Sequence, residues 1–274
     1  MNAPTILPTP QPPVAARRPH VSTFHGLTRQ DDWFWLRDRD DPEVRRHLEA
    51  ENAYTASVMA PASALQDDLS RELVARIQET DLSVPERDGA WLYYHRTEEG
   101  KQYPIHCRRH AGLDAPEEVL LDENVLAEGH AYFRLSALEV SPDHTRVAYA
   151  VDTSGSEEHT LRVRDIASGI DFPDAITGAS GNLCWAGDSA TIFYVVLDAA
   201  HRPWCVLRHR LGDDVAGDVV VHQEHDHGFF VGVMLSKSKR FILLETHSHT
   251  TSDALFLPAG EPDGFFRLVR PRVT

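Results

Sequence analysis

The chain has 274 residues, enough for one large domain or two ordinary ones, and its 42% hydrophobic and 25% charged content is typical of a globular protein rather than a disordered one. Lys and Arg number 27 against 42 Asp and Glu, which gives a net charge of -15. Because the basic residues cluster only as pairs of arginines, we expect no nucleic-acid partner. No stretch approaches the roughly 20 apolar residues of a membrane-spanning helix, so we expect no membrane partner either.

The first 19 residues contain six prolines and lack the apolar run of a secretory signal, which predicts a flexible Pro-rich tail over residues 1–19. The three cysteines, Cys107, Cys184 and Cys205, form an odd set without Cys-x-x-Cys spacing. Such a set is typical of a reducing compartment. We therefore expect a cytoplasmic location.

Residues 20–80 are predicted to form an N-terminal helical segment. Asp41 supplies a capping oxygen, Pro42 a preset dihedral angle and Glu43 a negative charge, so a helix should begin there. Further along, apolar residues recur at every fourth position and line one helix face that needs a cover. They are Leu65, Leu69, Leu73 and Ile77.

Residues 81–274 carry the pattern of a β domain. Short runs of β-branched and aromatic residues, such as 146–151, 192–197 and 241–244, are separated by turn residues. A turn motif before a strand repeats at three positions, 45 and 50 residues apart: Val140, Trp185 and Leu235. A four-stranded unit of this length is the blade of a β-propeller. A β-sandwich with accidental spacing is the alternative.

The spacing places blades at about 85–130, 135–178 and 180–225, and a truncated one over 229–274. The predicted fold class is therefore mainly β, a partial β-propeller of about three and a half four-stranded blades preceded by the helical segment. A propeller typically has at least four blades, so the array stops short of a closed ring. Either the chain is a fragment or a partner covers the open edge.

Motifs for catalysis are missing from the sequence. A hydrolase nucleophile needs glycine two positions before and two after the serine, and both Ser180 and Ser189 lack the second glycine and are expected in hairpin turns. Phosphate-binding, dinucleotide-binding and HExxH motifs are also absent from the sequence. We therefore assign no catalytic residue and expect no cofactor.

Two other clusters have a structural interpretation. The histidines of HQEHDHG and HSH do not have the spacing of a known metal site, so solvated turn histidines are favoured and no metal is expected. They are His222, His225, His227, His247 and His249. The aromatic run Trp33, Phe34 and Trp35 is predicted to pack in a core or an interface rather than to bind a ligand.

Several segments, in order, resemble the N-terminal part of the prolyl oligopeptidase family of serine peptidases, and most closely its oligopeptidase B group. They include HGLTR at 25–29, DDWFWLRD at 31–38, ENAY at 51–54, SPD at 141–143 and DTSGSEEHTL at 152–161. The resemblance implies a serine oligopeptidase with its Ser, Asp and His in a C-terminal α/β-hydrolase domain. It also implies an unclosed seven-bladed propeller that admits only short peptides, and cleavage after Lys or Arg.

By the same resemblance, the N-terminal helical segment would pack on the hydrolase domain and cover the apolar face that begins at Leu65. No position of this chain matches the family's nucleophile motif, so the catalytic domain is expected to be absent and the chain inactive alone. Its partners would be that domain and short cationic peptides. A stand-alone interaction module and a non-functional truncation product, which should aggregate, are the alternatives.

The stretch at 152–161 contains the one candidate site residue, Glu157. As an inter-domain or inlet carboxylate, it would pair with a cationic residue across the gap or attract a cationic peptide. A solvated hairpin charge is the alternative. His159 stands where the family usually has Tyr.

Overall fold

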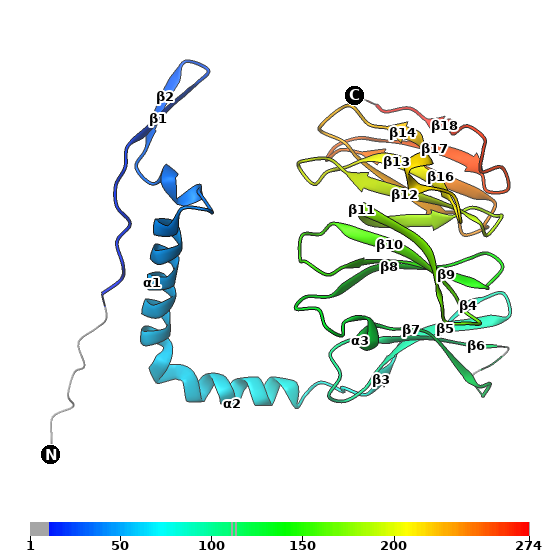
Figure 1. The fold of residues 1–274 in the computed structure, drawn as a ribbon, viewed down its shortest axis with the longest axis horizontal. Coiled ribbons are helices and arrows are strands. Elements are labelled where there is room, and N and C mark those ends of the chain that lie inside the picture. Colours follow the sequence, from blue (N-terminus) through cyan, green and yellow to red (C-terminus); the bar gives the residue numbers. More distant parts are fainter. Residues whose placement is uncertain (1–10, 111, 113, 274) are drawn as a thin grey trace. The chain divides into compact units, whose positions relative to one another are not determined.

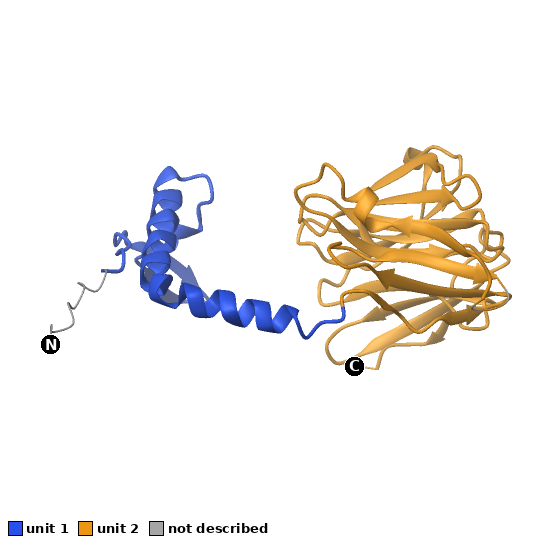
Figure 2. Cartoon of the chain, turned by 90° about the horizontal axis from the view of Figure 1, so that it is seen from below, with its two compact units in different colours: residues 1–78 blue, residues 79–274 orange. Residues whose placement is uncertain are grey.

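The structure is a computed structural model that describes residues 11–110, 112 and 114–273. The chain divides into two compact units, residues 1–78 and 79–274 (Figure 2). Part of the predicted tail, residues 1–10, lies outside the described residues, and residues 11–19 form neither helix nor strand. No helix within the described ranges is both long and apolar enough to cross a bilayer.

The first unit combines a β-hairpin with helices. Its elements are β1 (His20–Phe24), β2 (Leu27–Asp31), the 3-10 helices η1 (Phe34–Arg37) and η2 (Ala60–Ala62), and the α-helices α1 (Pro42–Met59) and α2 (Ser63–Val74). Helix α1 begins where the sequence indicates, and the Asp41 carboxylate accepts a hydrogen bond from the Glu43 N–H at 2.7 Å. The hairpin departs from the predicted helical segment because His25 and Gly26 both have positive φ, 50° and 78°. Such a pair favours a tight two-residue hairpin turn.

The predicted apolar face of the second helix is exposed. Leu65, Leu69, Leu73 and Ile77 retain between 49% and 64% of their accessible surface. By contrast, Phe34 stacks on His20 with ring centroids 3.7 Å apart, so part of the aromatic run packs inside the first unit.

The second unit contains three hydrogen-bonded antiparallel sheets, of five, seven and four strands. We divide the seven-stranded sheet at β11 and count its two halves separately, so that four sheets lie one above another in Figure 1. In the first sheet, β3 (Asp81–Leu82) and β4 (Glu86–Asp88) both pair with β5 (Trp91–Thr97), which is followed by β6 (Ile105–His110), β7 (Glu117–Asp122) and the short helix α3 (Glu123–Leu126). The second sheet contains β8 (Arg134–Val140), β9 (Arg146–Asp152), β10 (His159–Asp165) and the first half of β11 (Asp171–Trp185).

The third sheet contains the second half of β11, then β12 (Thr191–Leu197), β13 (Pro203–Arg210), the 3-10 helix η3 (Val215–Gly217) and β14 (Val219–Gln223). The fourth sheet contains β15 (Phe230–Leu235), β16 (Phe241–His247), β17 (Ser252–Pro258) and β18 (Arg267–Arg270). Every sheet is built from consecutive strands. The mainly β fold made of propeller blades is thus confirmed, and we refer to the sheets as the first to fourth blades.

Two details differ from the predicted blade limits. The second and third blades are not separated by a break, because Ala179 in the middle of β11 pairs with His159 on one side and with Val196 on the other. The fourth blade has four strands rather than the partial set predicted. Its last strand, β18, is exposed along its length and therefore has no alternating apolar signal in the sequence.

The hydrophobic core lies between neighbouring blades. Trp185, Ile192 and Ile176 belong to the cluster that joins the second blade to the third. Phe193 and Ile242 belong to the cluster that joins the third blade to the fourth. Because each blade buries its faces against the next, the stack holds the ends of the strands in fixed positions.

Candidate functional site

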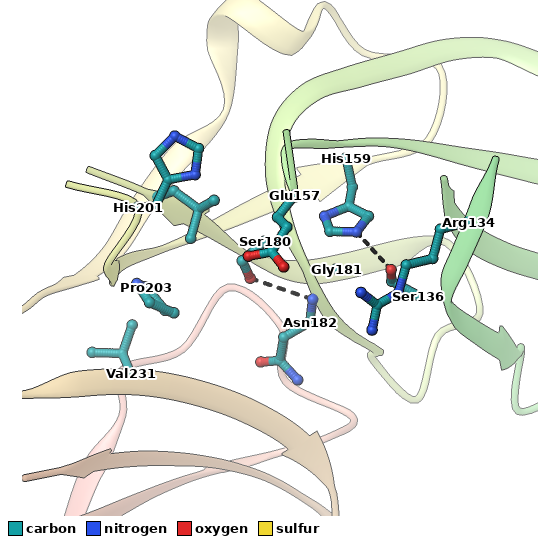
Figure 3. A pocket seen from close by; sticks show the side chains of 11 residues that line it. Arg134, Ser136, Glu157, His159, Ser180, Gly181, Asn182, His201, Pro203 and Val231 are labelled. Carbon is teal, nitrogen blue, oxygen red and sulfur yellow. Dashed lines mark hydrogen bonds between the residues drawn. The ribbon is translucent and has the colours of Figure 1, made fainter. Parts of the chain in front are cut away.

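A cavity of about 380 Å³, lined by both polar and apolar side chains, lies where the second, third and fourth blades meet (Figure 3). Its lining comes from the start of β8, the β9–β10 and β12–β13 loops, the middle of β11 and the start of β15. The lining residues are Arg134, Ser136, Glu157, His159, Ser180, Gly181, Asn182, Leu197, His201, Pro203 and Val231. The candidate from the sequence, Glu157, is one of them.

Glu157 is held in place by the buried Asp152. One oxygen of Asp152 accepts hydrogen bonds from the N–H groups of Ser154 and Gly155 at 2.8 and 2.9 Å, and the other accepts from the N–H of Glu157 at 2.8 Å. Burial alone would raise the pKa of Asp152, but these bonds and one from the Ser154 hydroxyl outweigh it and lower the pKa to about 2. The loop is therefore organised around a fixed carboxylate.

The backbone of Glu157 is strained. Its φ of 64° lies in the left-handed region that side chains other than glycine rarely adopt. Such a conformation persists only where the surrounding structure enforces it, and it is common at ligand clamps. Here the hydrogen bond from the Glu157 N–H to Asp152 supports it and sets the direction of the Glu157 Cα–Cβ bond.

Arg134 brings a second charge to the same cavity. It begins β8 directly opposite Asp152 of β9 in the strand register. Within the described part of the chain, neither the Arg134 guanidinium nor the Glu157 carboxylate has a hydrogen bond or an ion pair. The cavity thus carries one cation and one anion that the fold does not neutralise.

One wall of the cavity is a hydroxyl–imidazole pair that the sequence analysis did not anticipate. The Oγ of Ser136 lies 2.6 Å from Nε2 of His159, whose Nδ1 lies 3.3 Å from the Ala179 carbonyl oxygen. With the Nδ1–H directed at that carbonyl, Nε2 accepts the hydrogen bond from Ser136. A hydrolase site also needs oxyanion donors and an exposed nucleophile at a sharp strand-to-helix turn, whereas Ser136 lies within strand β8.

Gly181 makes this wall possible. Its φ is 81°, and a Cβ atom there would lie 3.0 Å from Cβ of Ser136 and 3.4 Å from the His159 ring. Any larger residue would push the pair apart, so the close contact between β8 and β11 requires glycine at this position.

The two serines that lack the second glycine of the nucleophile motif, Ser180 and Ser189, both make structural contacts. Ser180 lies within β11 rather than in a hairpin turn, and its Oγ accepts a hydrogen bond from the Asn182 N–H at 3.3 Å. Ser189 is buried, and its Oγ accepts from the Asp143 N–H at 3.1 Å, which ties the turns of two neighbouring blades together.

The histidine-rich segments lie near one another, because Arg272 pairs with Glu224 of the first and donates a hydrogen bond to Thr246 beside the second. Over the described ranges, no group of three or more His, Cys, Asp or Glu side chains is arranged to hold a metal ion. His222 is largely buried, and that burial lowers its pKa.

Consecutive antiparallel blades of four or five strands, three of which enclose a cavity, define a β-propeller-type domain. Comparison with known families identifies the family to which this domain belongs. The family model for the prolyl oligopeptidase N-terminal beta-propeller domain matches residues 12–274, and the chain belongs to this family. The resemblance of its sequence segments is thereby confirmed.

Similar proteins agree with this assignment. Dipeptidyl aminopeptidase BI of Pseudoxanthomonas mexicana is 40% identical over 95% of this chain, and Protease 2 of Moraxella lacunata is 34% identical over 95%. Each match takes up 39% of the relative. The structure of oligopeptidase B from Leishmania major superimposes with a TM-score of 0.88 at 31% identity, over 96% of this chain and 40% of that one. The chain spans 39 to 40% of the length of these proteins.

Proposed function

We propose that this chain is the gating and docking portion of a cytoplasmic, oligopeptidase B-like serine peptidase, and that an α/β-hydrolase domain outside this chain performs the chemistry. The observation that carries the proposal is the match of the family's propeller domain to residues 12–274. In such an arrangement the blades exclude folded proteins and pass flexible peptides. The propeller supplies selection by size, and the hydrolase domain supplies the nucleophile, the base and the oxyanion donors.

The substrates in this proposal are short peptides cut after Lys or Arg. The unpaired carboxylate of Glu157 and the net charge of -15 would both favour the approach of cationic peptides. As an inter-domain or inlet carboxylate, Glu157 would pair with a cationic residue of the hydrolase domain or of the peptide. The rigid support from Asp152 favours this role over that of a freely solvated charge.

The 40% identical relative favours a second candidate, because its name is that of a dipeptidyl aminopeptidase. The whole protein would then act at the amino end of peptides. An activity assay on the protein that includes the hydrolase domain distinguishes the two candidate functions. An endopeptidase cleaves an N-acetylated arginine amide as readily as substrates with a free amino end, whereas an aminopeptidase does not.

We expect the purified 274-residue chain to show no hydrolysis of an arginine amide above the buffer rate. The physical reason is that this reaction needs oxyanion donors and a triad. The measurement is release of the chromogenic amine with and without a serine-directed inhibitor. Because Ser136 and His159 are in contact, Ser136→Ala is the control variant. Inhibitor-sensitive hydrolysis that disappears in this variant would contradict the proposal, and hydrolysis that persists in it would indicate a contaminating peptidase.

The exposed face of α2 is proposed to dock on the hydrolase domain. In the isolated chain this face should cause self-association, because exposed apolar patches are normally covered. The double substitution Leu69→Glu and Leu73→Glu is expected to shift the chain toward monomer in sedimentation velocity. Arg71→Glu on the same helix is the matched control, since it changes charge without removing apolar surface. Equal effects of the two variants would argue against an apolar docking face.

A further inference from the structure

The cavity in Figure 3 places a cation beside the Glu157 carboxylate, and selection of peptides by size does not require that combination. Glu157 and Arg134 present opposite charges that are unpaired among the described residues. The left-handed φ of Glu157 is enforced by Asp152, which is itself paired in the strand register with Arg134. One anion and one cation are thus positioned by neighbouring residues on adjacent strands.

The rest of the lining completes a small site. Leu197, Pro203 and Val231 supply apolar surface from β12, β13 and β15. The hydroxyls of Ser136 and Ser180 supply polar contacts on the side of β8 and β11. A volume of about 380 Å³ is near the lower end of the range for small-molecule sites.

These charges narrow the class of ligand. A simple anion would neutralise Arg134 and leave Glu157 unpaired, and a simple cation would do the reverse. A zwitterion whose charged groups are separated by a short backbone satisfies both, with charge-assisted hydrogen bonds at each end. A cavity of about 380 Å³ has room for only a few residues, so the peptides considered are short ones.

We propose that this cavity binds a di- or tripeptide by its two free ends. The α-ammonium group donates to the Glu157 carboxylate, the α-carboxylate accepts from the Arg134 guanidinium, and an apolar side chain lies against Leu197, Pro203 and Val231. The choice of peptides among zwitterions rests on the proposed function. The site would retain short products or let them regulate the enzyme.

The test is isothermal titration calorimetry of the 274-residue chain with alanyl-leucine at neutral pH. We expect binding of the free dipeptide, and a loss of at least about tenfold in affinity on N-acetylation and again on C-amidation. Glu157→Gln should lower the affinity for the free dipeptide to a similar degree but leave the affinity for the N-acetylated dipeptide unchanged. Arg134→Gln should lower the affinity for the free dipeptide and leave the affinity for the C-amidated dipeptide unchanged. Such a result would assign the α-ammonium group of the peptide to Glu157 and its α-carboxylate to Arg134.

Glu128→Gln and Arg162→Gln are matched controls, because these residues carry the same charges outside the cavity lining. Both should bind the dipeptide as the wild type does. If Glu157→Gln lowers the midpoint of thermal unfolding, the variant Glu157→Gly is used in its place. Glycine tolerates a φ of 64°, and this substitution also removes the carboxylate.

The proposal is overturned if the wild-type chain does not bind alanyl-leucine, if blocked and free peptides bind equally, or if the control variants weaken binding as much as the cavity variants. The titration requires no catalysis. A failure here therefore leaves the proposed peptidase function standing, whereas hydrolysis by the isolated chain would overturn that function and not this site.

Discussion

Replacing Trp185 by alanine is expected to lower the free energy of unfolding of the second unit by about 3–5 kcal/mol. Trp185 is 1% exposed and belongs to the cluster between the second and third blades. Its indole N–H donates a hydrogen bond to the Glu139 carbonyl oxygen at 2.8 Å, which joins β11 to β8. The substitution removes a large apolar group, leaves a cavity and leaves that carbonyl without its partner.

Urea denaturation followed by far-UV circular dichroism measures this effect. Trp33→Ala is the matched control, because Trp33 is 46% exposed and its loss should change the free energy of unfolding by less than about 1 kcal/mol. Trp185→Phe separates the two contributions, since phenylalanine keeps most of the apolar volume and lacks the N–H donor. Equal urea midpoints for the wild type and Trp185→Ala would show that packing between the second and third blades does not depend on this residue.

The repeat that contains Trp185 also explains how far the fold could be predicted from the sequence. Each blade begins with a strand, a tight turn and a second strand, and these turns contain glycine, aspartate or serine at regular spacing. The predicted strands at 146–151 and 192–197 correspond to β9 and β12. The continuity of β11 could not be predicted, because the glycines and serine at 178–181 have the composition of a turn. Gly178 and Gly181 do have positive φ, yet strand pairing continues through Ala179 between them.

The candidate site was predictable only where a local motif marks it. Glu157 stands in a segment that resembles the family pattern, and Asp152 within the same segment holds it by local hydrogen bonds. Arg134, Ser136 and Val231 carry no such signal, because they reach the cavity through the stacking of blades. The contact of Ser136 with His159 joins residues 23 positions apart and depends on the register of three strands.

Replacing Asp152 by asparagine is expected to lower the free energy of unfolding by about 2 kcal/mol at neutral pH. The carboxylate accepts from three backbone N–H groups, whereas the amide nitrogen of asparagine would face one of those donors. The variant should also release Glu157 from its left-handed conformation, so the affinity of the cavity for alanyl-leucine should fall even though both charged side chains remain.

The pH dependence gives the sharper test. The pKa of Asp152 falls from an ordinary value of 3.8 to about 2 in the folded protein, so the folded state binds fewer protons than the unfolded state between these values. Its contribution to stability is therefore complete above about pH 5 and is lost as the pH falls through 4 toward 2. The difference in free energy of unfolding between wild type and Asp152→Asn should be constant from pH 5 to 8 and shrink below pH 4. Glu158→Gln, an exposed neighbour outside this network, should show no such change. A difference between wild type and Asp152→Asn that stays constant down to pH 2.5 would mean that the charge of Asp152 does not hold the loop.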